Sequence, residues 1–257
     1  MSQETIDNIF GFGLEYFSGE IWMSLVVMLA IIILTFVIYF KFKNADPTKA
    51  NGGFVLVVEL LIEKLEDFTI GLMGKKNKKM SGYFLAVAMY ILFSFLIGLL
   101  GLPGPLTYLG CTFSLALCTF ALIHWTAIKK NKLGYFKRFV EPLPILLPIN
   151  LLSMWAPLLS LSLRLFGNAL AGFTLMSIIY FALGNASMMA FGWLLPSSPI
   201  AWSGLILPPL VTPLLHVYFD LFAGAIQTLI FCMLSMIFIS QEDPDEEEIQ
   251  SQVDIKN

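Results

Sequence analysis

The sequence predicts an all-α integral membrane protein, and three observations carry that prediction. Hydrophobic residues make up 58% of the 257-residue chain, charged residues only 13%, and the mean hydropathy is +0.81. A water-soluble domain carries about 25% charged residues, so this chain is too poor in charge for a water-facing globule. Uncharged apolar runs also reach the length at which a helix crosses about 30 Å of hydrocarbon. We expect a single membrane domain over residues 1–257 with about five spans.

Nothing in the chain points to a metal or a bound cofactor, and we expect neither. Its cysteines are odd in number and lie inside apolar runs, which argues against a disulfide framework, and no Cys/His cluster occurs. No GxxxxGK[ST] motif is present, so we expect no nucleotide site in this chain, and we expect no nucleic-acid partner. The acidic first 20 residues lack the basic region of a signal peptide, so insertion is expected to begin with the first span.

The first part of the chain predicts one span and one surface helix. Residues 21–40 carry no charge and form the first span, and lysines follow it. Within 54–74, apolar residues recur near helical spacing, while Glu59, Glu63 and other charged residues crowd the remaining surface. This pattern is typical of an amphipathic helix at the membrane interface, and the basic patch KKNKK follows at 75–79.

Residues 81–128 predict a helical hairpin, because two uncharged runs are separated there by the turn sequence GLPGP. The basic loop KKNKLGYFKRF follows at 129–139. By the positive-inside rule both lysine-rich loops are cytoplasmic, which places the N-terminus outside. His124 lies beside Trp125 near the end of a span, and we interpret the two as an interfacial anchor pair.

Residues 142–240 predict a second hairpin, whose two helices are longer than an upright span needs. Prolines mark the start of this region, and PSSP at 196–199 divides it. Excess helix length is accommodated by tilt, so we expect both helices to be strongly tilted. Between 142 and 240 only Arg164 and Asp220 are Asp, Glu, Lys or Arg residues. An acidic, solvated tail is expected at 241–257.

Arg164 is a permanent cation inside this apolar region. A guanidinium keeps its charge at ordinary pH, and at a bilayer centre it costs roughly 3 kcal/mol on insertion scales. Ser160, Arg164 and Asn168 share one helical face with small residues that let another helix approach closely. Two interpretations stay open: a structural ion pair with Asp220, or a place on the path of a coupling ion, which intramembrane ionisable groups usually mark.

The facing helix carries the remaining polar groups, since His216, Asp220 and Gln227 share a face of a regular helix. Asp220 is either a hydrogen-bonded interior carboxyl or a relay for protons. His216, one turn away, is either its relay partner or a packing residue. Gln227 does not titrate, but its amide can bridge neighbours as donor and acceptor.

Two stretches of this region carry a family resemblance. LSLSLRLFGNALAG, residues 159–172, closely resembles the signature helix of subunit a of the F-type ATP synthases. LLHVYFDLFAGAIQTLIFCMLSMIFI, residues 214–239, looks like that family's last helix. The resemblance extends from about 20 to 240. It implies a stationary membrane subunit that lies beside a rotating c-ring, with the long hairpin against the ring.

The resemblance also implies roles for individual residues. Arg164 matches the family's essential arginine, Asn168 the asparagine after it, and Gln227 the glutamine of the final helix. Asp220 matches a carboxylate or histidine position that lines the access half-channel.

Two departures from the family pattern shift weight among the acidic groups. Many members carry glutamate where this chain has Ser153 and Phe173. More of the proton relay therefore rests on Asp220, with His216 and water, and the exit path has no identified carboxylate.

The mechanism that the resemblance implies is proton translocation through two offset aqueous half-channels, coupled to rotation and ATP synthesis. Its implied partners are the c-ring, subunit b of the peripheral stalk and membrane lipid, and no catalytic residue is expected in this chain. Proton is the default ion, with sodium left open. A bacterial plasma membrane is the expected location, with the mitochondrial inner membrane as the alternative.

Two other classes of protein were weighed. An autonomous secondary transporter would use Arg164 and Asp220 as an intramembrane substrate site, but such proteins often contain internal repeats, and none is found. An intramembrane hydrolase would need a second catalytic carboxylate or a GxSxG or HExxH motif, which the sequence lacks.

Overall fold

A computed structural model describes residues 19–43, 53–102, 104–132, 135, 147–191, 204 and 206–242. Within these ranges every regular element is helical, and five helical segments are long and apolar enough to cross a membrane. The predicted all-α membrane class with about five spans is therefore confirmed. The predicted PSSP break lies outside the described residues, as do the acidic N-terminal segment and residues 243–257 of the expected tail.

The first two helices differ in their charge. Helix α2 (Gly19–Lys43) includes the predicted first span, and after Glu20 it carries no charge until its last turn, where Lys41 and Lys43 lie. Helix α3 (Gly53–Met73) carries several charges and is not among the candidate spans. It packs against α9 and α4 and buries Thr69 and Met73, while large apolar residues such as Leu61 stay exposed.

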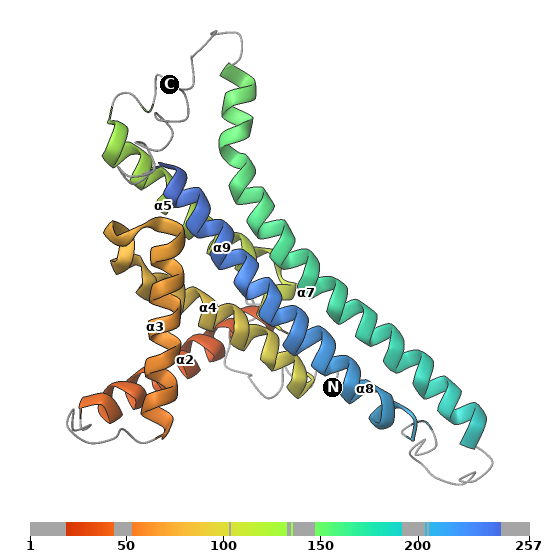
Figure 1. Cartoon of the computed structure of the whole chain (residues 1–257). Helices are drawn as coiled ribbons and strands as arrows, with labels where there is room; N and C mark the ends of the chain where they lie inside the picture. Colours follow the sequence, from red (N-terminus) through yellow and green to blue (C-terminus); the bar gives the residue numbers. More distant parts are fainter. Residues whose placement is uncertain are drawn as a thin grey trace, which may run out of the picture.

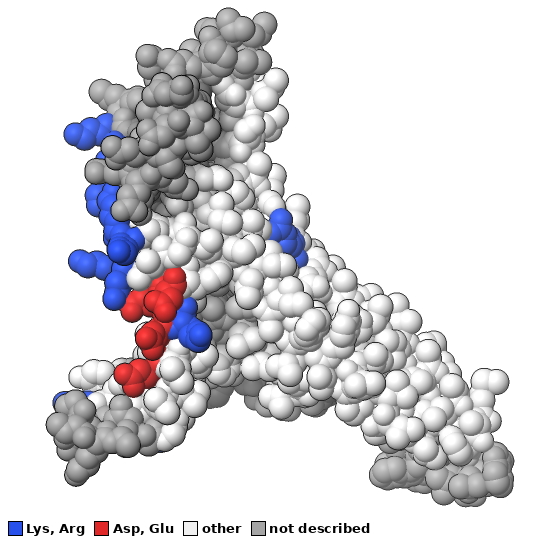
Figure 2. Space-filling model, in the orientation of Figure 1, with Lys and Arg blue, Asp and Glu red and all other residues white. Residues whose placement is uncertain are grey.

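The lysine-rich residues after α3 form a short 3₁₀ helix, η1 (Lys75–Met80). Lys78 there makes an ion pair with Glu66 of α3, with 3.0 Å between nitrogen and oxygen. Figure 2 shows basic and acidic residues gathered on this side of the molecule, while most of the remaining visible surface is uncharged. The charges thus lie together at one edge of an apolar bundle.

The first helical hairpin consists of α4 (Ser81–Leu96) and α5 (Leu109–Asn131), with two short 3₁₀ helices between them. These are η2 (Ile97–Leu100) and η3 (Pro105–Thr107). Gly101 ends η2 with φ 71°, a left-handed conformation that residues with a Cβ rarely adopt. A turn therefore separates α4 from α5 where the GLPGP sequence predicts one.

The second hairpin dominates the shape of the molecule. Helix α7 (Leu147–Phe191) has 45 residues and is about 68 Å long at 1.5 Å per residue. The second arm of the hairpin consists of three helical elements. They are α8 (Pro208–His216), the π-helical turn η6 (Val217–Ala223) and α9 (Gly224–Glu242). Figure 1 shows α7 as one long rod with α8 and α9 beside it. Its length is about twice what an upright crossing needs, in line with the expected tilt.

The core lies where α4, α5, α7 and α9 meet. Phe84 and Ile91 of α4, Leu158 and Leu165 of α7, and Phe231 of α9 are almost fully buried there. Only one side of α7 takes part, because many of its large apolar residues are exposed. The fold therefore leaves a long face of α7 without cover from the described part of its own chain.

Two details of this second arm differ from what the sequence predicts. The π-helical turn at Val217–Ala223 interrupts the regular helix assumed for His216, Asp220 and Gln227, and π turns change the rotation per residue. Helix α9 also continues through Gln241 and Glu242, which were expected to belong to a solvated tail.

Candidate functional site

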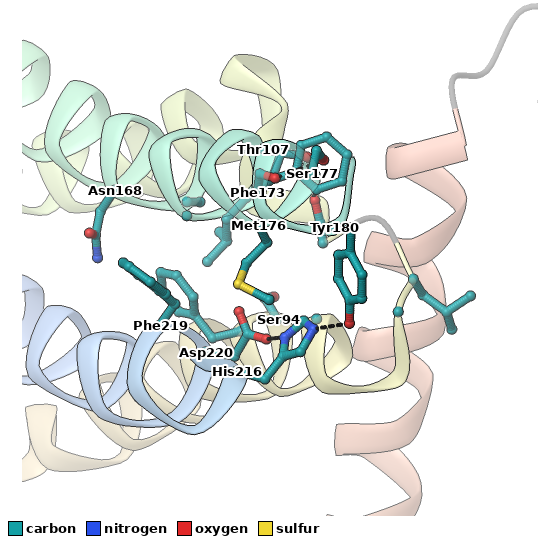
Figure 3. A pocket seen from close by; sticks show the side chains of 18 residues that line it. Ser94, Thr107, Asn168, Phe173, Met176, Ser177, Tyr180, His216, Phe219 and Asp220 are labelled. Atoms are coloured by element: carbon teal, nitrogen blue, oxygen red, sulfur yellow. Dashed lines mark hydrogen bonds and ion pairs between the residues drawn. The ribbon is translucent and has the colours of Figure 1, made fainter. Parts of the chain in front are cut away.

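A cavity of about 360 Å³ lies between the end of α4, the second half of α7 and the π turn. We call it the Asp220 cavity. Its polar lining comes from five elements, and Figure 3 shows the side chains of Asn168, Tyr180, His216 and Asp220 around it. Three of these side chains are titratable: Tyr180, His216 and Asp220. The cavity thus gathers three titratable groups at one end of a mostly apolar helical hairpin.

The titratable groups form one hydrogen-bonded chain across the hairpin. The Asp220 carboxylate oxygen Oδ2 lies 2.5 Å from Nδ1 of His216, and Nε2 of the same ring lies 2.8 Å from the Tyr180 hydroxyl. A neutral imidazole has one donor and one acceptor nitrogen, so it can bond both neighbours at once. The Asp220 and His216 side chains are each 17% exposed. The chain can therefore pass a proton between the cavity and a carboxylate that is largely shielded from solvent.

Local backbone structure places Asp220 in this chain. Pro213 inside α8 has no backbone N–H, so the helix loses one hydrogen bond just before the π turn begins. Single π turns within helices are frequent at functional sites. The turn starts directly after His216 and contains Asp220, and the i, i+4 contact between them closes within it.

Arg164 does not lie in the cavity. It is the only Asp, Glu, Lys or Arg residue in α7, its side chain is exposed, and Figure 2 shows the surface of this helix as white apart from one blue area. Its Nη2 donates to the hydroxyl of Ser160 at 3.1 Å. Within the described part of the chain no carboxylate pairs with it, because Asp220 pairs with His216 instead. The structural ion pair between Arg164 and Asp220 is therefore not formed.

The two predicted amides have different surroundings. Asn168 is half-buried and lines the Asp220 cavity one turn beyond Arg164. Gln227 is only 6% exposed, and its Nε2 has no hydrogen-bond partner among the described residues. The structure therefore brings Asn168, His216 and Asp220 together, while Arg164 faces outward and Gln227 lies in the core.

A second polar cavity, of about 300 Å³, lies at the other end of the same hairpin. We call it the His124 cavity. Its lining includes Asn150 and Ser153 from the start of α7 and Glu242 from the end of α9. His124 Nδ1 lies 2.9 Å from the hydroxyl of Tyr135. This cavity has its own titratable groups, and Glu242 is one of the residues that the sequence reading placed in the tail.

The anchor interpretation of His124 is wrong in part. Trp125 is 69% exposed, as an interfacial residue would be, but His124 turns inward to line the cavity. Neighbouring positions on a helix point about 100° apart, so the two side chains cannot share one environment.

Arg164 lies between the two cavities along α7. The α7 lining of the His124 cavity ends at Pro157, and that of the Asp220 cavity begins at Asn168. Eleven residues of helix separate these positions, about 16 Å. The buried residues between them are Leu158, Leu161 and Leu165, each with at most 1% exposure, and Ser162, whose hydroxyl donates to the backbone oxygen of Leu159. A buried, mostly apolar segment thus separates the cavities, with a fixed positive charge nearby on the outer face of α7.

Sequence reasoning missed Tyr180, Tyr135 and Glu242. A tyrosine in an apolar helix looks like a packing residue, and only the register of the hairpin brings Tyr180 opposite His216. Glu242 had a usable signal, because the apolar pattern of α9 continues to within a few residues of it.

The chain is similar to a family of known proteins. The family model described as ATP synthase A chain matches residues 21–240. The ATP synthase subunit a of Mycoplasmoides gallisepticum is 36% identical over 248 residues, covering 89% of this chain and 81% of that protein. The subunit a of Mycoplasma genitalium is 37% identical over 218 residues, covering 80% and 73%.

A more distant relative comes from Propionigenium modestum. It is an ATP synthase subunit a described as sodium ion specific, and it is 27% identical over 268 residues, covering 97% of this chain and 81% of that protein. The matches include both signature stretches and every helix from α2 to α9. This multi-pass membrane protein therefore belongs to the ATP synthase subunit a family.

Proposed function

We propose that the chain is the stationary subunit that conducts protons to and from the c-ring of an ATP synthase through two offset half-channels. The observation that carries this proposal is the order of features along α7. The His124 cavity lies before Arg164, the Asp220 cavity lies after it, and a buried, mostly apolar segment separates the two. In this proposal neither half-channel crosses the membrane alone, so a proton leaves this chain for the c-ring to pass from one to the other.

The Asp220 cavity is the proposed access half-channel. The basic loops at 75–79 and 129–139 mark the cytoplasmic side, and the Asp220 cavity lies at the opposite end of α4 and α5. Protons that enter from outside meet the Tyr180–His216–Asp220 chain and are passed to a carboxyl on the ring. Asn168 lines the same cavity and orients water there through its amide.

The His124 cavity is the proposed exit half-channel. It lies at the cytoplasmic ends of α5 and α9, where the basic loop 129–139 follows α5. His124 and Glu242 supply titratable groups on this side. Ser153 lines the same cavity, at the position where the family resemblance implies a glutamate in many members. His124 and Glu242 take over the role of that glutamate in this proposal.

Arg164 is proposed to separate the two paths. Its exposed guanidinium has no carboxylate partner within the described chain, so the ionised carboxylate of a passing c-subunit can take that place. Moving one charge across the membrane releases roughly 2.3 kcal/mol per 100 mV, similar to the roughly 3 kcal/mol that inserting an arginine costs. Because a guanidinium cannot release its proton, it cannot itself carry protons between the cavities.

The proposed ion is the proton, and the proposed location is a bacterial plasma membrane. An imidazole between a carboxylate and a phenol passes protons, whereas hard cations bind through oxygen ligands. The proposed partners are the c-ring at the exposed face of α7, subunit b and membrane lipid. No chemical step of ATP synthesis is assigned to this chain.

Replacement of Arg164 tests the proposal directly. In vesicles that contain the whole ATP synthase complex, Arg164→Ala is expected to abolish ATP-driven proton pumping and to allow a passive proton leak. Lys64→Ala, which removes an exposed cation from α3, is the control and keeps pumping. Coupled pumping that survives Arg164→Ala contradicts the separation mechanism.

The choice of ion is tested in the same vesicles. Acidification of the vesicle lumen is expected without added sodium, and uptake of radioactive sodium is expected to be absent. Pumping that requires sodium would overturn the proton assignment. Ion uptake by the purified chain without a c-ring would favour the autonomous transporter instead.

A further inference from the structure

The carboxyl group of Asp220 lies against a glycine of the 3₁₀ helix that follows α4. A Cβ built on Gly98 would lie 3.0 Å from both Cγ and Oδ1 of Asp220 and 3.1 Å from Oδ2. These separations are shorter than ordinary van der Waals contacts between carbon atoms, which are about 3.5–4.0 Å. A side chain at position 98 would therefore push the carboxyl group away by a few tenths of an ångström.

Backbone conformation does not explain this glycine. Gly101, three residues later, has φ 71° and is required by the turn, whereas Gly98 lies within η2, between helical residues, and has no positive φ. Its missing side chain is needed for space. The space is used by the carboxyl group of Asp220, the acidic residue that lines the cavity.

A second glycine makes the same contact from the opposite side. A Cβ built on Gly224, at the start of α9, would lie 2.8 Å from Cβ and Cγ of Phe95. Phe95 is three residues before Gly98, and Gly224 is four residues after Asp220. Each segment therefore places one side chain against a glycine of the other, and α4 and η2 contact the π turn and α9 there.

We propose that Gly98 is a positioning residue that holds the Asp220 carboxyl group in line with His216. This inference rests on the proposed relay function of Asp220. The carboxyl group lies within 3.1 Å of the position that a Cβ of Gly98 would take, and it bonds the His216 ring at 2.5 Å. A methyl group at position 98 shifts the carboxyl group by a few tenths of an ångström, which weakens the shortest link of the hydrogen-bonded chain. Among the described residues that line the cavity, His216 and Tyr180 are the titratable groups that face it.

The test compares two alanine variants of the same helical hairpin in vesicles that contain the complete ATP synthase complex. Gly98→Ala is expected to lower ATP-driven proton pumping by about threefold, less than the roughly 100-fold that a misplacement of a full ångström can cost. Gly82→Ala in α4 is the control, because a Cβ there meets nothing within 4 Å. The amount of assembled complex and its thermal dissociation temperature are measured for both variants.

A pH profile separates positioning from general damage. The limb of the pumping profile that depends on Asp220 is defined as the one that disappears in Asp220→Asn. Gly98→Ala is expected to move this limb, whereas a merely structural effect lowers the amplitude and leaves the limb in place. Unchanged pumping with an unmoved limb overturns the inference about Gly98.

A double variant covers the case in which Gly98→Ala does not assemble. The three heavy atoms nearest to the added Cβ all belong to Asp220, so Gly98→Ala/Asp220→Ala is expected to assemble. If the double variant also fails, the clash lies elsewhere and the inference is wrong. If Asp220→Asn alone leaves pumping intact, the relay function fails instead, so the two failures are distinguishable.

Discussion

The two histidines of the chain lie in different cavities but make the same kind of contact. His216 bonds the hydroxyl of Tyr180 at 2.8 Å, and His124 bonds the hydroxyl of Tyr135 at 2.9 Å. In both cavities the imidazole and the phenol belong to different helical segments or turns. A shared His–Tyr contact therefore does not distinguish the two ends of the hairpin.

The position of the carboxylate in each cavity does distinguish them. His216 bonds the carboxylate of Asp220, one turn away along the same helical segment, at 2.5 Å, whereas the carboxylate that lines the His124 cavity, Glu242, comes from the C-terminal end of α9. Asn150 and Ser153 also line the His124 cavity, and their polar groups can hold water. The comparison predicts that pumping depends more strictly on single side chains in the Asp220 cavity.

The largest effect is expected for Asp220→Asn, which keeps the shape of the side chain and removes its ability to carry a proton. ATP-driven pumping in vesicles of the whole complex is expected to fall about 100-fold or more, the usual scale for loss of a proton-transfer group. Asp67→Asn makes the same change on the exposed side of α3 and is expected to have no effect. Equal pumping by both variants would remove the basis for distinguishing the cavities.

The two histidines offer a direct comparison between the cavities. Glutamine keeps hydrogen-bonding groups but does not titrate, so His216→Gln is expected to lower pumping by about tenfold or more. His124→Gln is expected to have a smaller effect, because Asn150, Ser153 and Glu242 line the same cavity and supply other polar groups for water and protons. The initial rate of vesicle acidification measures both. A larger loss for His124→Gln would reverse the assignment of the direct relay.

The tyrosines sharpen the same comparison at a smaller scale. Tyr180→Phe and Tyr135→Phe each remove one hydroxyl and leave the ring in place, and a single hydrogen bond contributes about 0.5–1.5 kcal/mol. We expect Tyr180→Phe to lower pumping by about twofold to tenfold, since each 1.4 kcal/mol corresponds to tenfold in rate. Tyr135→Phe is expected to change pumping less. Equal losses would show that the hydroxyls matter in the same way at both ends.

The sequence indicates the fold better than it indicates the contacts of the site. Long uncharged runs predict the membrane class because hydrocarbon admits few charges, and this physical constraint does not depend on how the helices pack. The pairing of Tyr180 with His216 depends on the register of two long helices, which apolar periodicity does not specify. Apolar periodicity does not indicate the π turn around Asp220 either, and a regular helix was therefore assumed for Gln227.

The smallest effect is expected at Gln227, which lies on α9 between the two cavities. Its buried amide nitrogen has no partner among the described residues, and leaving a buried donor unsatisfied costs about 1–3 kcal/mol. Methionine fills a similar volume without a donor, so Gln227→Met is expected to raise the dissociation temperature of the solubilised complex by about 2–4 °C. Ser235→Ala, which removes another buried hydroxyl without a described partner, is expected to shift it in the same direction. A lower dissociation temperature for Gln227→Met alone would mean that its amide is bonded in the complex, by water or by the c-ring. The barrier between the cavities would then have a polar element at Gln227.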